Sequence, residues 1–350
     1  MFGSVPLLSL VPRPQPALPA SGGDVVSESV PKLVQLGSAL AVFFGILLIV
    51  FFVAGRATGR LQRPVALLVL VGPAVLLMLA GLVVPAVSTT FYSFRNANSS
   101  RWVGLGNYRW AFTDPDMRHV LLNTVWWIVI APVAATALGL VLALLADRMP
   151  PRAESVTKSL IFLPMAISFV GASIIWKFVY EARDPSVPQV GLLSEVVMKL
   201  GWRHPPDWIL WQPWNTLLLM VIMVWVETGF AMVVLSAAIK AIPREIIEAA
   251  QLDGAVGRQL FARVTVPMIR GTLVVVLTTI MITVLKVFDI VRTMTGGNFG
   301  TSVLANEMYA QRFVQFNTGR GTALAVLLFV GVIPLIVYNV RTLRVERSVR

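Results

Sequence analysis

The chain has 350 residues, of which 57% are hydrophobic and only 13% are charged. Soluble domains rarely reach such an apolar fraction, and the apolar residues gather in long blocks, so the sequence predicts an all-α integral membrane protein. It contains no cysteine and two histidines, which excludes a disulfide framework, a thiol nucleophile and a thiolate metal site. We attribute the net charge of +12 to basic loops that orient a membrane protein, and not to nucleic-acid binding.

The N-terminal residues 1–32 are rich in Pro, Gly and Ser and predict a disordered extracytoplasmic tail. The first apolar block is followed by a basic loop, with Arg56, Arg60 and Arg63. A cleaved signal peptide has its basic residues before the apolar block, so we favour an uncleaved helix with its N-terminus outside. A signal peptide remains the alternative.

Seven apolar blocks are long enough to cross about 30 Å of hydrocarbon. Four of these blocks contain proline, which membrane helices tolerate because neighbouring groups satisfy the freed backbone. The predicted spans, in chain order, are 33–54, 65–87, 119–145, 159–180, 215–238, 271–291 and 321–340.

The loops between these spans differ in their density of basic residues. One alternate set, which is 55–64, 146–158, 239–270 and 341–350, carries 15 Lys and Arg in about 65 residues. The loops on the opposite side, which are 1–32, 88–118, 181–214 and 292–320, carry 12 Lys and Arg in about 125 residues. We therefore predict that the denser set is cytoplasmic, with the N-terminus outside and the C-terminus inside.

The longest of the predicted cytoplasmic loops reads "IPREIIEAAQLDGAVGRQLFARVTVP", residues 242–267. Pro243 suits the first position of a helix, and Gly254 suits a left-handed helix end. Glu245 and Glu248 fall in the first turns, where they favour the helix dipole. A second short helix is expected over 256–264. The small residues between the charges favour a helix held in a cleft of another protein, and a solvated loop is the alternative.

The pattern Glu248-Ala249-Ala250, three residues, Gly254, nine residues and then Val264-x-Val266-Pro267 resembles the EAA loop of ABC importer permeases, which prefer Ile-x-Leu-Pro at its end. Other phrases resemble the binding-protein-dependent sugar permeases of the maltose-permease type, and some resemble their α-glucoside subfamily. These phrases are "VGLGNYRWAFTDPDMRHVLLNT" (103–124), "FLPMAIS" (162–168), "GFAMVVLSAAIKAIP" (229–243), "VLKVFDIV" (284–291) and "VLANEMY" (303–309). The resemblance covers about residues 65–343.

The resemblance implies the transmembrane architecture of a type I ABC importer over 65–343, preceded by an extra helix and basic loop at 33–64 and followed by a basic tail at 344–350. It implies a multi-pass permease subunit in the cell membrane that takes up an α-glucoside or a related small sugar. The implied partners are a second permease subunit, a dimer of ATP-binding subunits and an extracytoplasmic sugar-binding protein. In this reading Glu248, Ala249, Ala250 and Gly254 dock in a groove of the ATPase.

The chain has no G-x-x-x-x-G-K-[ST] phosphate loop, so we expect it not to be an enzyme and to bind no cofactor, with ATP hydrolysis left to a partner. Ionisable groups inside spans usually face a cavity or a partner, which makes Glu227 and Lys286 candidates for the translocation path. An ion pair of Lys286 with Asp289 or with Glu227 is the open alternative, and Lys177 is expected to snorkel to the interface. The resemblance and helical spacing add Trp225, Thr228, Gly229, Met232 and Thr283 to the candidate path residues Glu227 and Lys286. An aromatic and methionine face is more often a sign of plain helix packing.

Two other classes of protein compete with this interpretation. An ion-coupled carrier commonly shows inverted repeats with broken helices, and no such repeat is visible in the sequence. A membrane enzyme needs paired acids or a histidine cluster. Asp114 and Asp116 form a close acid pair, and their place before a predicted span suits a helix cap better than a catalytic role. Tryptophans in the outer loops, including Trp208, are expected to anchor at the membrane interface.

Overall fold

The computed structural model describes residues 71–349 without a gap and a few isolated positions between 34 and 52; side chains are described as far as residue 341. The predicted tail 1–32 and nearly all of the predicted first span therefore lie outside the described residues, as does the start of the second span. The chain divides into two compact units, Met1–Pro85 and Ala86–Arg350. The arrangement described below is that of the second unit.

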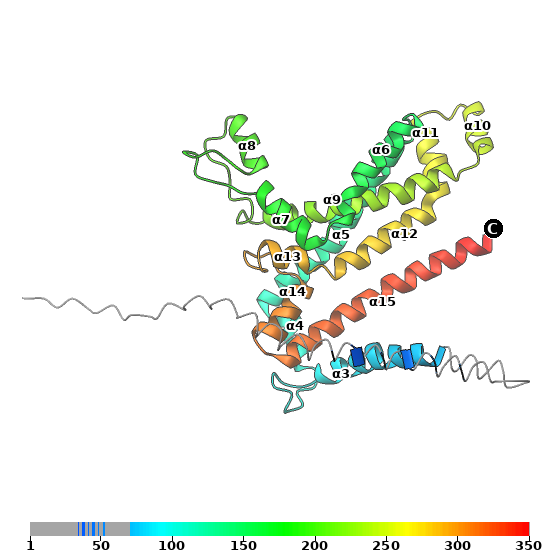
Figure 1. The fold of residues 1–350 in the computed structure, drawn as a ribbon. Helices are drawn as coiled ribbons and strands as arrows, with labels where there is room; N and C mark the ends of the chain where they lie inside the picture. The colour runs from blue at the N-terminus through cyan, green and yellow to red at the C-terminus, as the bar shows by residue number, and fades with distance from the viewer. Residues whose placement is uncertain are drawn as a thin grey trace, which may run out of the picture. The chain divides into compact units, whose positions relative to one another are not determined.

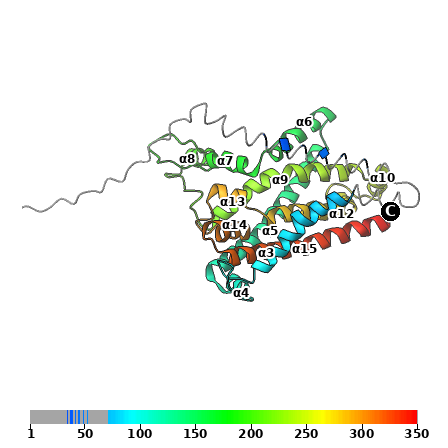
Figure 2. The ribbon, with the colours of Figure 1, turned by 60° about the horizontal axis from the view of Figure 1, so that its bottom comes forward.

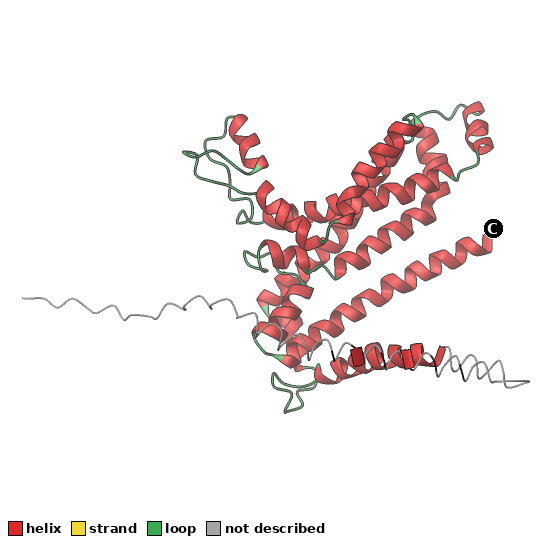
Figure 3. Ribbon diagram, in the orientation of Figure 1, coloured by secondary structure: helices red, strands yellow, loops and turns green. Residues whose placement is uncertain are grey.

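In residues 71–349 the regular secondary structure is helical (Figures 1 and 3). One isolated antiparallel β-bridge joins Arg95 and Trp102 in the same part of the chain. The α-helices are α3 Val84–Tyr92, α4 Gly106–Thr113, α5 Pro115–Ala146, α6 Pro151–Phe162, α7 Phe169–Val179, α8 Leu192–Lys199, α9 Trp214–Lys240, α10 Arg244–Leu252, α11 Arg258–Leu260, α12 Val266–Leu285, α13 Asp289–Met294, α14 Leu304–Tyr309 and α15 Thr318–Val349.

Five stretches are long and apolar enough to cross a membrane, and a bent pair of helices raises the number to as many as six. The five are Val71–Tyr92, Pro115–Ala146, Trp214–Lys240, Arg258–Leu285 and Thr318–Arg341. The predicted all-α membrane class is thereby confirmed. The predicted total of seven includes the first span, of which the structure describes only isolated positions.

The long helix α5 begins four residues before the predicted span. Asp114 precedes it and accepts a hydrogen bond from the Met117 amide at 3.1 Å, while Pro115 occupies the first helical position. A capping carboxylate satisfies one of the free amides of the first turn. The expected cap role of Asp114 is confirmed.

The predicted fourth span is not one straight helix. It consists of α6 and α7, whose axes differ by 102° across a short break. Pro164 lies in a 3-10 turn, Leu163–Ala166, that ends α6, because proline lacks the amide that would continue the helix. Ser168 then starts α7 by accepting a hydrogen bond from the Gly171 amide at 3.1 Å. The predicted span over 159–180 is therefore formed by a bent pair of helices.

The predicted sixth span is also displaced. A continuous helical stretch runs over Arg258–Leu285 through a π-helical turn at Phe261–Thr265, so the expected separate helix at 256–264 is wrong. The wide turn precedes Pro267, whose ring would press on the carbonyl four residues earlier in a regular α-helix. The stretch ends at Leu285, and a new helix, α13, begins at Asp289, so the predicted end at 291 is wrong as well.

Close packing of α5 on α9 forms the centre of the second unit. A Cβ atom at Gly139 of α5 would lie 2.5 Å from the Cβ of Ala231 and 2.8 Å from the amide nitrogen of Met232, both in α9. Only glycine allows the two helices to approach so closely. Trp127 of α5 and Met223 of α9 are fully buried in the apolar cluster that surrounds this contact.

The helices of the second unit run between two ends (Figures 1 and 2). The start of α6, the helices α10 and α11 and the end of α15 lie at one end, which we call the α10 end. The helices α8, α13 and α14 lie at the opposite end, which we call the α8 end. The segments at the α10 end belong to the loops that are predicted to be cytoplasmic.

Candidate coupling helix and translocation path

The helix α10 is built as the sequence predicts, with one difference at its start. Pro243 is the residue before the helix, with φ −56° and ψ 133°, and not its first helical residue. At the other end Gly254 has φ +84°, which confirms the expected left-handed conformation. The Gly254 amide donates to the carbonyl of Gln251 at 3.0 Å, and the Ala255 amide donates to that of Ala250 at 2.9 Å. This pair of bonds is a Schellman motif, which ends the helix sharply.

The surface of α10 lacks cover within the described part of the chain. None of its residues is buried. Leu252 is 90% exposed and Val256, in the following turn, is 67% exposed. Glu248 and Ala249 are exposed and Ala250 is half-buried. The loop therefore presents apolar side chains beside charged ones at the α10 end.

A cavity of about 210 Å³ lies at the break between α12 and α13. Two candidate path residues, Thr283 and Lys286, line it. Lys286 is the residue at which α12 ends, so its side chain is exposed beside the break and does not lie within a continuous helix. The other lining residues are Phe169 of α7, Met223 of α9, and Val287, Phe288, Asp289 and Ile290.

The candidate path residues on α9 lie elsewhere. They are not among the residues that line this cavity. The Thr228 hydroxyl donates within its own helix to the carbonyl of Val224 at 2.6 Å, and Met232 is fully buried. Trp225 meets Trp176 of α7 edge to face, with ring centroids 5.9 Å apart. These contacts are those of helix packing.

Gly229 marks a close approach of α9 to α6. A Cβ atom at Gly229 would lie 2.6 Å from the carbonyl oxygen of Ile161 and 2.7 Å from the Cα of Phe162. Contact with backbone atoms at this distance leaves no room for a side chain. The position therefore joins two helices and does not open onto the cavity.

The charges inside the spans do not form either of the pairs considered from the sequence. Glu227 is 7% exposed, so its carboxyl group is buried in α9. Among the described side chains, no ion pair joins Lys286 to Glu227 or to Asp289. Lys286 is therefore available to the cavity.

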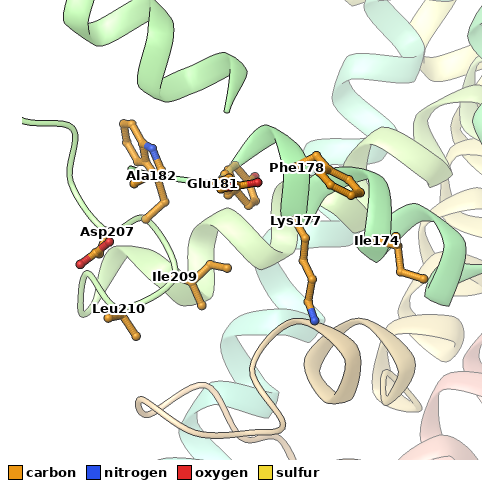
Figure 4. A pocket seen from close by; sticks show the side chains of 10 residues that line it. Ile174, Lys177, Phe178, Glu181, Ala182, Asp207, Ile209 and Leu210 are labelled. Carbon is orange, nitrogen blue, oxygen red and sulfur yellow. The ribbon is translucent and has the colours of Figure 1, made fainter. Parts of the chain in front are cut away.

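A larger cavity, of about 510 Å³, lies at the α8 end between α7 and the segment 207–210 (Figure 4). Its lining includes Lys177, whose side chain points away from Glu181 and Asp207. Trp208 also lines it but is only 8% exposed, and its indole donates to the hydroxyl of Ser194 at 3.0 Å. The expectation that Trp208 anchors at the membrane interface is wrong, because its polar atom finds its partner inside the protein.

Comparisons with known proteins identify the family. The model for "Binding-protein-dependent transport system inner membrane component" matches residues 135–350. The chain is 47% identical to the osmoprotective compounds uptake permease protein GgtC of Synechocystis sp. over 280 residues, which cover 80% of this chain and 99% of GgtC. It is 46% identical to the alpha-glucoside transport system permease protein AglF of Rhizobium meliloti over 270 residues, which cover 77% of this chain and 80% of AglF.

A solved structure shares the fold. A chain of a bacterial alginate ABC transporter, solved in complex with its alginate-pentasaccharide-bound periplasmic protein, matches with a TM-score of 0.69 and 19% identity. The match covers 80% of this chain and 94% of that one. The protein described here is therefore a multi-pass membrane protein that belongs to the family of binding-protein-dependent transport system inner membrane components, the permeases of ABC importers.

Proposed function

We propose that this chain is the permease subunit of an ATP-driven importer that takes up an α-glucoside or a related small sugar. The observation that carries the proposal is the similarity, over more than three quarters of the chain, to both an alpha-glucoside permease and a permease for osmoprotective compounds. Small sugars and glucosylated polyols share flat apolar ring faces and many hydroxyl groups. One path suits both, provided that it offers apolar faces and a few hydrogen-bonding groups.

The importer domain in this proposal covers 65–343, with an extra helix before it and a basic tail after it. The partners are a second permease subunit, a dimer of ATP-binding subunits and an extracytoplasmic sugar-binding protein. The absence of a phosphate loop in the sequence supports an external source of ATP hydrolysis. The exposed apolar side chains on and after α10 support a protein partner at the α10 end.

Within that partner contact, Ala249 and Ala250 would let a groove of the ATPase approach the helix closely. Glu248 is exposed on the same helix, where a basic side chain of the partner can pair with it. Gly254 sets the direction in which the chain leaves the groove, because its left-handed conformation ends α10. When the ATPase moves α10, the path would then change the side of the membrane to which it opens.

Thr283 and Lys286 are the first candidates for contact with the sugar, because both line the cavity at the break of α12. Thr283 is well suited to bind a ligand, since its only hydrogen bond in the described structure is a long one of 3.2 Å to the carbonyl of Thr279. Phe169 and Phe288 supply aromatic groups to the same cavity for the faces of a sugar ring. Trp225, Glu227, Thr228, Gly229 and Met232 would shape the path through packing.

The proposal is tested with vesicles that contain this chain, the second permease and the ATPase, with the binding protein added outside. Maltose, trehalose, sucrose and glucosylglycerol are offered one at a time. We expect at least one of them to raise the rate of ATP hydrolysis and to accumulate inside the vesicles. Uptake that requires an ion gradient and no ATP would support the ion-coupled carrier and overturn the proposal.

A further inference from the structure

Four charged side chains and one hydroxyl meet at the α10 end, where α5 ends, α6 begins and α9 ends. We call them the ionic cluster: Asp147, Glu154, Lys158, Ser236 and Lys240. The Glu154 carboxylate accepts hydrogen bonds from the ammonium groups of both Lys158 and Lys240. Lys158 also donates to the Ser236 hydroxyl, and the Nζ of Lys240 lies 3.6 Å from Asp147. The cluster joins all three helices and balances two acids with two lysines.

Two members of the cluster are shielded from solvent, while Asp147 and Lys240 are 36% and 47% exposed. Glu154 is 13% exposed and Lys158 is 18% exposed. The pair Glu195–Lys199 on α8 has the same spacing of four residues, but its side chains are 43% and 75% exposed. Solvent and salt screen an exposed pair far more than a shielded one. The ionic cluster links α6 to α9 through a carboxylate, that of Glu154, which is better shielded than either member of the pair on α8.

A second contact fixes the same two helices about two turns away along α9. This is the approach of Gly229 to the backbone at Ile161 and Phe162. Two attachment points prevent α6 from swinging about either one. Helices α6 and α9 must consequently move as one body.

This body connects α10 to the cavity. Lys240 is the last residue of α9, and only residues 241–243 separate it from α10. At its other end α6 leads through the turn at Leu163–Ala166 to Phe169, the first residue of α7, which lines the cavity beside Thr283. A displacement of α10 thus has a short physical route, through α6, to a wall of the cavity.

We propose that Glu154 is a positioning residue that transmits the movement of α10 to the cavity, because it binds Lys158 and Lys240 at the same time. The inference rests on the proposed function. A neutral side chain of the same shape keeps the packing but removes the charge that holds both lysines. Without this link, α6 is held to α9 by the contact at Gly229 and the Lys158–Ser236 hydrogen bond, so α6 and Phe169 follow the movement of α10 less closely.

The test uses the complete importer in vesicles and measures the sugar transported per ATP hydrolysed. We expect Glu154→Gln to lower this ratio by about fivefold or more, which is the lower range of coupling between sites. Lys240→Gln should lower it similarly, and the double variant should fall no further, because both changes break one link. Glu195→Gln is the matched control, with the same chemical change in a Glu–Lys pair at the α8 end, and should leave the ratio at the wild-type value.

The outcomes distinguish a failure of the proposed function from a failure of the inference about Glu154. Wild-type vesicles without sugar-stimulated ATP hydrolysis would overturn the proposed function and this inference with it. Coupled wild-type vesicles and a Glu154→Gln variant with an unchanged ratio would overturn this inference alone. Should Glu154→Gln fail to assemble, Lys240→Gln decides, since its lysine is 47% exposed and its loss leaves the Glu154–Lys158 pair intact. An unchanged ratio in an assembled Lys240→Gln complex would also overturn the inference.

Discussion

Gly229 of α9 lies against the backbone of α6 at Ile161, so closely that a Cβ atom would stand 2.6 Å from the carbonyl oxygen. Backbone atoms cannot move aside as the end of a flexible side chain can. The packing of α6, the first half of the broken span, against α9 therefore requires a glycine at this position.

Gly229→Ala should consequently destabilise the protein. Overpacking of a close contact typically costs about 1–3 kcal/mol. We expect a lower apparent melting temperature of the purified permease complex, followed by tryptophan fluorescence in detergent. Sugar preference should stay unchanged, because the position does not line the cavity.

Gly331→Ala on α15 is the control for this change. A Cβ atom there would lie 3.4 Å from a side-chain atom of Leu285, which is an ordinary contact. It should melt close to the wild type. A Gly229→Ala protein that is as stable as the control but prefers another sugar would show that Gly229 belongs to the path and not to the packing.

The sequence predicts the membrane class and the build of α10 well, because both depend on local patterns. Apolar blocks define spans, and an Asp-Gly turn after two alanines defines a helix end. The cap at Asp114 is of the same local kind. The structure agrees with the sequence at these points apart from shifts of a few residues at the ends of helices.

The breaks in the fourth and sixth spans escape sequence reasoning for a physical reason. A proline within an apolar block is compatible with a kinked helix, a 3-10 turn or a continuous helix. Pro132 lies within α5, whereas Pro164 lies at a break. No local sequence signal distinguishes the proline that is tolerated from the proline that breaks the helix. Neighbouring helices decide the outcome. The ionic cluster is hidden likewise, since its members come from three segments of the chain.

Asp114→Ala should weaken the start of α5. The carboxylate accepts a hydrogen bond from the Met117 amide, and loss of such a cap costs about 0.5–2 kcal/mol. We expect a small fall in the apparent melting temperature and normal transport at low temperature. Asp114→Asn, which retains a capping oxygen, should restore most of the loss. A loss of transport in a stable Asp114→Ala complex would favour a direct role for this carboxylate.

Gly254→Ala should weaken the attachment of the ATPase. The left-handed conformation at φ +84° costs about 1–2 kcal/mol for a residue with a side chain, so the end of α10 would shift or strain. We expect less ATPase to co-purify with the permease and slower sugar-stimulated ATP hydrolysis.

Gly201→Ala provides the matched control for Gly254→Ala. This glycine has φ +95° and lies at the α8 end, and a Cβ atom at either glycine would meet no atom within 4 Å. The two changes strain the backbone alike but at opposite ends. Equal loss of the ATPase from both variants, or from neither, would contradict the docking of α10.

Thr283→Val should reduce sugar uptake without loss of stability. Valine has the shape of threonine but lacks its hydroxyl, and one hydrogen bond is worth about 0.5–1.5 kcal/mol, or about 2–13-fold in affinity. We expect KM for uptake to rise within that range while ATPase assembly stays normal. Lys286→Met should have a larger effect, because it removes a charged donor from the same cavity.

The control for Thr283→Val is Thr279→Val, one turn earlier in α12. The Thr279 hydroxyl donates to the carbonyl of Val275 at 2.7 Å and does not line the cavity. Its removal should leave KM unchanged, since the backbone carbonyl keeps its own helical partner. If both valine variants transport every sugar of the panel with the wild-type KM, and Lys286→Met does so as well, the cavity at the break of α12 is not the sugar site. In that case the path must run along α9, where Trp225 and Thr228 then become the residues to replace.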